Sequence, residues 1–263
     1  MVLAWDGPVE DVTSPILDSN GDRVVIGRIA QMDQNEAMKV AAAAKAAWNN
    51  GQGVWPQMSM RERIDAIMNL VAALMEQRDQ IIHTLMWEIC KTSSDATAEF
   101  DRTMQYIDAT IQAIVDMDEK KGGYQTVSGI LAKVRRGAIG VMLALGPFNY
   151  PFNETYTTLI PALLMGNVVV MKIPTVGGLA HVLSMGAYAN TLPPGVVNFI
   201  SGPGRVTMAP IMESGPDILA FIGGSKAADA LLTSHPAPHR LKTVLSLEGK
   251  NLGEILFVWV WVL

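Results

Sequence analysis

Two glycine-containing turns have residue types that suit phosphate binding. Gly223, Gly224 and Ser225 follow an apolar run and precede a helix-compatible stretch. Their backbone N–H groups can therefore hold a pyrophosphate at the positive end of that helix. Gly202 and Gly204 stand in a similar place after VVNFIS. A tight strand-to-helix turn needs glycine for steric reasons alone, so both interpretations stay open for each turn.

Other reactive side chains give weaker signals. Lys172 ends the run VVVMK and can be an ordinary solvated lysine. His235 and His239 have a spacing seen in metal sites, but the prolines between them forbid the helix that would align the rings, so we predict no metal site. Cys90 is the only cysteine, which excludes an internal disulfide. A lone helical cysteine is usually a small core residue, and we assign Cys90 no catalytic role.

The composition predicts a globular protein with small-molecule partners. The chain has 263 residues, of which 49% are hydrophobic and 17% charged. A chain of this length and hydrophobic content can bury a sizeable core. The net charge is −5, without long runs of either sign, and this argues against nucleic-acid or anionic-membrane partners. We see no secretory signal, and with one cysteine we expect a reducing, cytoplasmic location.

The elements that must position these residues fall into two parts. Helical periodicity and capping residues predict helices from Asp33, from Ser59 with a break near 77–79, and over 96–116. From about 131 onward, apolar runs alternate with helix-compatible stretches. Such alternation is typical of a doubly wound parallel sheet, an α/β fold whose ligands bind beyond the carboxyl ends of the strands.

Six short motifs occur in order along the second half of the chain: GPFNYP (146–151), PALLMGN (161–167), VMKIPT (170–175), PGVVN (194–198) followed by Gly202 and Gly204, FIGGS (221–225), and LSLEGK (245–250). In this order and at these spacings, they resemble the aldehyde dehydrogenase superfamily. The resemblance runs from about Val12 to Leu256 and implies the Rossmann-like cofactor domain of that fold. The FNYP and KIPT segments look most like NADP-dependent, non-phosphorylating glyceraldehyde-3-phosphate dehydrogenases.

This resemblance implies a reaction and roles for one turn. In the family, a Cys thiolate attacks an aldehyde, a hydride passes to nicotinamide, and water hydrolyses the thioester. Asn149 matches the residue whose side-chain N–H meets the developing oxyanion, although an Asn between prolines also stabilises a turn. Pro147 and Phe148 match turn positions beside the cofactor.

The resemblance also implies the cofactor contacts. Lys172 matches a lysine that contacts the adenosine ribose, and Thr175 matches the position that discriminates between cofactors. A Glu there would repel a 2′-phosphate, whereas Thr leaves room and offers a donor, so we expect NADP, with NAD as the alternative. Gly202, Gly204 and the 223–225 turn match phosphate-side segments, but Gly224 replaces the family's Ser and removes one contact.

Two departures concern catalysis. The family's catalytic Cys lies well beyond the LELGGK segment, and no such Cys occurs here; Cys90 belongs to a helical segment that we expect to lie away from the Asn149 turn. The family's general base, the Glu of LELGGK, is replaced by Ser246. Glu248, two residues later, either serves with altered geometry or is structural.

We therefore predict an N-terminal cofactor-binding domain over 1–263, with a helical part at about 33–120 and a Rossmann-like part at about 131–250. The run 255–263 is predicted as a strand, and we expect the chain to be truncated, with the catalytic domain missing. The family oxidises aldehydes, with glyceraldehyde 3-phosphate as a candidate substrate, but this chain alone is expected to be inactive. The alternative is a non-enzymatic dinucleotide-binding fragment that pairs with a full-length homologue; a homo-oligomer is a further expectation.

Overall fold

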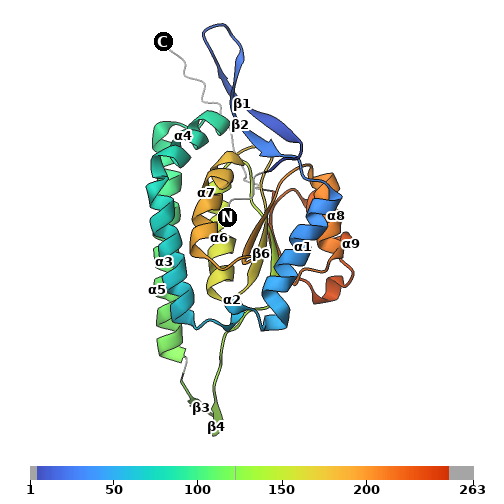
Figure 1. Ribbon diagram of the computed structural model, residues 1–263. Helices are drawn as coiled ribbons and strands as arrows, with labels where there is room; N and C mark the ends of the chain where they lie inside the picture. The colour runs from blue at the N-terminus through green and yellow to red at the C-terminus, as the bar shows by residue number, and fades with distance from the viewer. Residues whose placement is uncertain (1–4, 122, 249–263) are drawn as a thin grey trace, which may run out of the picture.

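The computed structural model describes residues 5–121 and 123–248, which form a central sheet covered by helices on both faces (Figure 1). The sheet has five strands in the order β7-β6-β5-β8-β9, and all neighbours are parallel. The strands are β5 (Val141–Leu145), β6 (Val168–Lys172), β7 (Val197–Ile200), β8 (Ile218–Gly223) and β9 (Lys242–Leu247). The predicted doubly wound parallel sheet is confirmed.

Alternate residues of each strand face two different cores. On β5, Met142 and Ala144 pack with α6 (Pro151–Leu164) and α7 (Leu179–Thr191). Val141 and Leu143 instead pack with α1 (Gln34–Trp48), α8 (Gly204–Glu213) and α9 (Ser225–Ser234). Because side chains alternate between the faces of a strand, a strand buried on both faces is expected to be apolar, as VMLAL is throughout and VVVMK is up to its last residue, Lys172.

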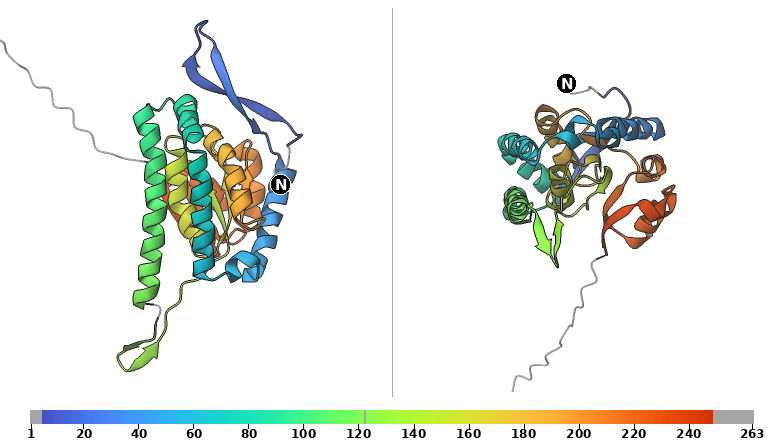
Figure 2. Two further views of the ribbon diagram at one scale, coloured as in Figure 1. Left: turned by 60° about the vertical axis from the view of Figure 1, so that its left-hand side comes forward. Right: turned by 90° about the horizontal axis from the view of Figure 1, so that it is seen from below.

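The helical N-terminal part adds a layer outside α6 and α7. It contains α3 (Met60–Glu76), α4 (Arg78–Ile89) and α5 (Ser93–Lys121), with the short α2 (Val54–Gln57) before them. Figure 2 shows this layer side by side with the sheet-covering helices. Capping boxes at Asp33 and Ser59 start α1 and α3, and the chain breaks between α3 and α4 at Gln77, as the sequence predicts.

Two hairpins were not predicted. β1 (Val9–Leu17) pairs antiparallel with β2 (Arg23–Ala30), and this hairpin projects beyond the helices in Figure 1 and in the left view of Figure 2. β3 (Gln125–Val127) pairs with β4 (Ile130–Ala132) at the opposite end of the molecule. Single 3₁₀ turns occur at Asn49–Gly51 and Pro238–Arg240. The predicted strand over 255–263 lies outside the described residues.

Cys90 corrects one expectation. It is exposed, and it ends α4 in the left-handed conformation with φ of 55°, so it is not a core residue. The segment that follows it is also closer to the Asn149 turn than expected, because the Lys91 ammonium lies 3.5 Å from the centre of the Tyr150 ring. The sequence missed this contact because it joins two elements far apart in the chain.

Candidate functional site

The predicted site residues gather at one edge of the sheet, because parallel strands place all their carboxyl ends together. Gly202 follows β7, Thr175 follows β6, Asn149 follows β5, Ser225 follows β8 and Glu248 follows β9. The chain order runs outward from β5 to β7 on one side and from β8 to β9 on the other. The strand order thus reverses between β5 and β8, and this switch point is where ligands of open α/β sheets bind.

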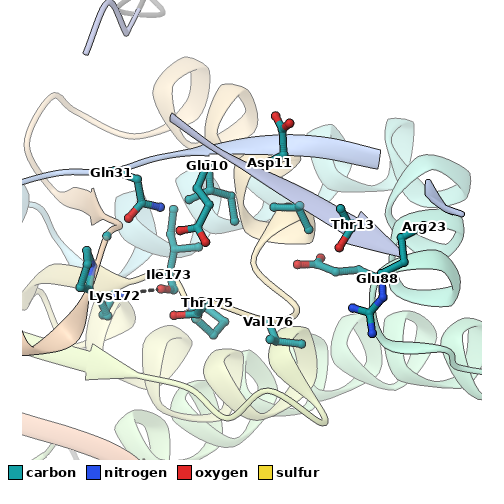
Figure 3. A pocket seen from close by; sticks show the side chains of 15 residues that line it. Glu10, Asp11, Thr13, Arg23, Gln31, Glu88, Lys172, Ile173, Thr175 and Val176 are labelled. Carbon is teal, nitrogen blue, oxygen red and sulfur yellow. Dashed lines mark hydrogen bonds between the residues drawn. The ribbon is translucent and has the colours of Figure 1, made fainter. Parts of the chain in front are cut away.

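A cleft of about 390 Å³ opens at the end of β6. It brings Lys172, Thr175 and Gly202 together with Glu88 of α4 (Figure 3). The β1–β2 hairpin closes the cleft from above and contributes residues that include Glu10, Asp11, Thr13 and Arg23. The hairpin is therefore a wall of the candidate site that sequence periodicity did not reveal. The Asn149 turn and the 223–225 turn lie outside the lining of this cleft.

Lys172 is a buried lysine without a carboxylate partner in the described part of the chain. Its side chain is 7% exposed, and Nζ donates a hydrogen bond to the carbonyl oxygen of Ile173 at 2.6 Å. Burial lowers the pKa of Lys172 to about 8, because the charged form loses hydration that no anion replaces. Lys172 is therefore not the ordinary solvated lysine that the sequence also allows.

The glycines of the β7 turn have different roles. Gly202 has φ of +90°, and a Cβ there would lie 2.6 Å from the backbone oxygen of Met32. Packing and conformation alone therefore require glycine at this position. Gly204 is the first residue of α8, and a Cβ there would meet only Met208 at 3.9 Å, so crowding does not require glycine at this position. The steric interpretation holds for Gly202 and does not account for Gly204.

The turn after β5 is held from below by a buried carboxylate. Pro147 is half-buried, and both Phe148 and Asn149 are exposed. Helix α6 begins two residues after Asn149 and has no side-chain cap from its own N-cap residue, Tyr150. Glu99 of α5 supplies one instead, because its Oε1 accepts the backbone N–H groups of Phe152 and Asn153 at 3.0 and 3.1 Å.

Glu88 does the same for α7. Its two carboxylate oxygens accept the backbone N–H groups of Gly178 and Leu179 at 2.9 and 3.0 Å. Burial nevertheless raises the pKa of Glu88, against the lowering effect of these hydrogen bonds. Sequence reasoning missed Glu88 and Glu99. The sequence does hold a signal for Glu88. It lies three residues after Leu85 and seven after Ile81, so it is a charged residue on an otherwise apolar helix face.

At the end of β8, Gly224 caps α9 and Ser225 is its first residue, as expected. A Cβ on Gly224 would meet only Glu248 Oε1, at 3.6 Å, so this glycine is not required by crowding. The Glu248 carboxylate accepts both the backbone N–H and the hydroxyl of Ser225, each at 3.0 Å. The structure therefore places Glu248 at the N-terminus of α9, in contact with Ser225, one of the predicted pyrophosphate donors.

The fold and these motifs agree with comparisons to known proteins. The chain belongs to the aldehyde dehydrogenase family, whose sequence model matches residues 10–256. It is 33% identical over 237 residues to an NADP-dependent glyceraldehyde-3-phosphate dehydrogenase from Streptococcus equinus, covering 88% of this chain and 48% of that protein. The corresponding enzyme from Zea mays is 30% identical over 209 residues, covering 75% of this chain and 40% of the relative.

Solved structures give the same result. An NADP-dependent glyceraldehyde-3-phosphate dehydrogenase from Bacillus halodurans C-125, complexed with NADP, superposes with a TM-score of 0.78 at 26% identity and covers 93% of this chain and 50% of that chain. A betaine aldehyde dehydrogenase from Staphylococcus aureus in complex with NAD+ shares the fold, with a TM-score of 0.77 at 22% identity, 93% coverage of this chain and 48% of the other. The chain thus spans about half the length of the relatives it matches.

Other chemistry receives no support in the described ranges. Residues 5–121 and 123–248 contain no group of three or more His, Cys, Asp or Glu side chains arranged to hold a metal ion. His235 is buried and bonded to the carbonyl of Pro216 at 2.9 Å, which makes it a structural histidine. No helix in these ranges is long and apolar enough to cross a membrane.

Proposed function

We propose that this chain binds a nicotinamide dinucleotide along the carboxyl edge of its sheet, as the cofactor-binding part of an aldehyde dehydrogenase. The observation that carries the proposal is the placement of Lys172 at the end of β6, with Thr175 just beyond it, and of the α9 N-terminus after β8, on opposite sides of the β5–β8 switch point. The likeness to relatives named for NADP, and to a structure complexed with it, supports the proposal.

The residues fit such a group at both ends. The buried Lys172 ammonium has only a carbonyl as partner, so ribose hydroxyls or a phosphate would give it the ligands it lacks. Thr175 is exposed and small, which leaves space for a 2′-phosphate and favours NADP over NAD. At the other end, Gly204 and the 223–225 turn present backbone N–H groups at the starts of α8 and α9.

Aldehyde oxidation is the activity we propose for the complete enzyme, with glyceraldehyde 3-phosphate as the candidate substrate. When bound, the dinucleotide supplies the hydride acceptor. Asn149 lies exposed at the switch point, where its amide N–H can donate to an oxyanion, and Pro147 and Phe148 precede it in the turn. This chain alone would be inactive, because its only cysteine, Cys90, ends α4 and no other thiol is present.

The hydrophobic core also bears on how the chain is divided into domains. We propose that the helical part and the Rossmann-like part form one domain, since residues of α3, α4 and α5 share a core with those of α6, α7 and the sheet. A homo-oligomer, or pairing with a full-length homologue, stays a prediction.

Calorimetric titration of the 263-residue chain with NADP and with NAD tests the cofactor proposal. Wild-type protein is expected to bind NADP more tightly, and Lys172→Met to lose at least tenfold in affinity, because the methionine keeps the packing but donates no hydrogen bond. Lys39→Met is the matched control, since Lys39 is exposed on α1 and does not line the cleft. Equal affinities for wild type and Lys172→Met would refute the proposed site.

Thr175 is tested in the same assay. Thr175→Glu is expected to weaken NADP binding strongly and to leave NAD binding unchanged or improved, because the new carboxylate repels a 2′-phosphate and accepts from a 2′-hydroxyl. Thr175→Ser is the control, because it keeps the donor and the available space. An unchanged ratio of NADP to NAD affinity in Thr175→Glu would contradict the role of Thr175.

A further inference from the structure

The N-terminus of α9 already holds an anion, and that anion belongs to the chain itself. One oxygen of the Glu248 carboxylate accepts the Ser225 backbone N–H, and the other accepts the Ser225 hydroxyl, both at 3.0 Å. A free N–H at the first turn of a helix attracts negative charge, and a carboxylate there is stabilised by the helix dipole. The 10-residue helix α9 therefore has its anion-binding end engaged from within the molecule.

The position of Glu248 is set by its backbone as well as its side chain. Its N–H donates to the carbonyl of Gly223 at 3.2 Å, which ties the end of β9 to the end of β8. Its φ is 33°, in the left-handed region that glycine adopts more readily than glutamate. A glutamate in this conformation, with both oxygens bonded to Ser225, lies over the turn, although it remains exposed.

Gly224 completes the arrangement. In the family pattern the position of Gly224 carries a serine and that of Glu248 a glycine. This chain has therefore lost a polar side chain at Gly224 and gained a charged one at Glu248. The structure puts them next to each other, since a Cβ on Gly224 would lie 3.6 Å from Glu248 Oε1. The polar group missing from one side of the turn is thus replaced by a charged group from the other.

We propose that Glu248 is a built-in competitor for the cofactor's phosphate groups, which must displace its carboxylate from Ser225 to bind at α9. This inference rests on the proposed dinucleotide site. The Ser225 N–H and hydroxyl each have one proton to donate and cannot serve the carboxylate and a phosphate together. Two anions at one helix end also repel each other, so the carboxylate lowers cofactor affinity for as long as it stays in place.

The test compares NADP affinity and thermal stability in wild type, Glu248→Gln and Glu248→Gly. Glu248→Gln removes the charge and keeps the shape, while Glu248→Gly also removes the left-handed strain. Glu213→Gln is the matched control, because it makes the same charge change at the exposed end of α8. We expect both Glu248 variants to bind NADP about three- to tenfold more tightly, and Glu213→Gln to bind like wild type.

Stability separates competition from a merely structural role. Without cofactor, Glu248→Gln is expected to melt at a lower temperature than wild type, because α9 loses its charged cap, and yet to bind NADP more tightly. Unchanged or weaker binding in Glu248→Gln, while Lys172→Met still weakens binding at least tenfold, would overturn the competition and leave the proposed function standing. Absence of binding in wild type and in both Glu248 variants would overturn the dinucleotide site itself.

Discussion

Glu99 and Phe152 are separated by 53 residues in sequence, yet Glu99 Oε1 accepts the Phe152 backbone N–H at 3.0 Å. Glu99 is fully buried, and its other oxygen pairs with Lys91, whose ammonium lies over the Tyr150 ring. One carboxylate thus joins α5, the end of α4 and the start of α6. The turn that presents Asn149 is fixed by this three-way contact and not by its own sequence alone.

Glu99→Gln is expected to lower the free energy of unfolding by about 2–4 kcal/mol. The amide cannot balance the charge of Lys91, which is largely buried, and breaking a buried pair leaves an uncompensated charge. Urea unfolding followed by circular dichroism measures the effect. Asp101→Asn on the same helix is the control, because its partner Arg78 is more exposed and the loss should stay below about 1 kcal/mol. Equal losses in the two variants would contradict the role of Glu99.

Cys90 occupies a position that favours glycine. Its φ of 55° at the end of α4 costs a non-glycine residue about 1 kcal/mol, part of which glycine returns through the greater entropy of the unfolded chain. Cys90→Gly is therefore expected to raise the free energy of unfolding by about 0.5 kcal/mol or more. Cys90→Ala removes the thiol without relieving the conformation and should give no gain. A destabilised glycine variant in chemical denaturation would contradict this account.

His181 makes stability depend on pH. It is a fully buried residue of α7, its Nε2–H donates to the carbonyl of Pro151 at the start of α6 at 3.0 Å, and burial lowers its pKa to about 4. The unfolded chain, with an ordinary histidine pKa near 6.5, binds a proton first, so stability falls as pH drops from about 6.5 towards 4.

We expect about 2 kcal/mol less stability at pH 5 than at pH 7 from this one group. His181→Gln should lose most of that difference, whatever its own stability at pH 7, whereas the exposed His239→Gln should keep the wild-type profile. The measurement is urea unfolding at a series of pH values. A His181→Gln profile as steep as wild type would show that another group is responsible.

Cofactor affinity should also depend on pH, through Lys172. Because burial lowers its pKa to about 8, the free protein loses the ammonium above that pH, and an anionic cofactor binds the charged form better. NADP binding is therefore expected to weaken about five- to tenfold between pH 7 and pH 9. Lys172→Arg, which stays charged, should show a flat profile in the same titrations. A flat wild-type profile would contradict the prediction.

The parts of the fold that sequence predicted are those with strong periodicity. Runs such as VMLAL are apolar throughout because both faces are buried, and the capping residues Asp33 and Ser59 mark true helix starts. The β1–β2 hairpin escaped prediction because most of it is exposed and β1 contains Pro15, so neither alternation nor a breaker-free run signals a strand.

The site was predictable only where a motif named its residues. Lys172, Thr175 and Ser225 were found because each belongs to a family motif at or just beyond the end of a recognisable strand. Glu88 and Glu99 were not, because their hydrogen bonds to α7 and α6 join segments 90 and 53 residues apart. Glu248 was identified as a residue of interest, but its contact with Ser225 depends on strands β8 and β9 being neighbours, which no local pattern specifies.

A crystal structure of this chain with NADP would show whether a nicotinamide dinucleotide lies along the carboxyl edge of the sheet. We expect the adenosine ribose to contact Lys172 and Thr175, the pyrophosphate to bind at Ser225, and the Glu248 carboxylate to be displaced from α9. NADP bound elsewhere on the surface, with the contact between Glu248 and Ser225 intact, would contradict it.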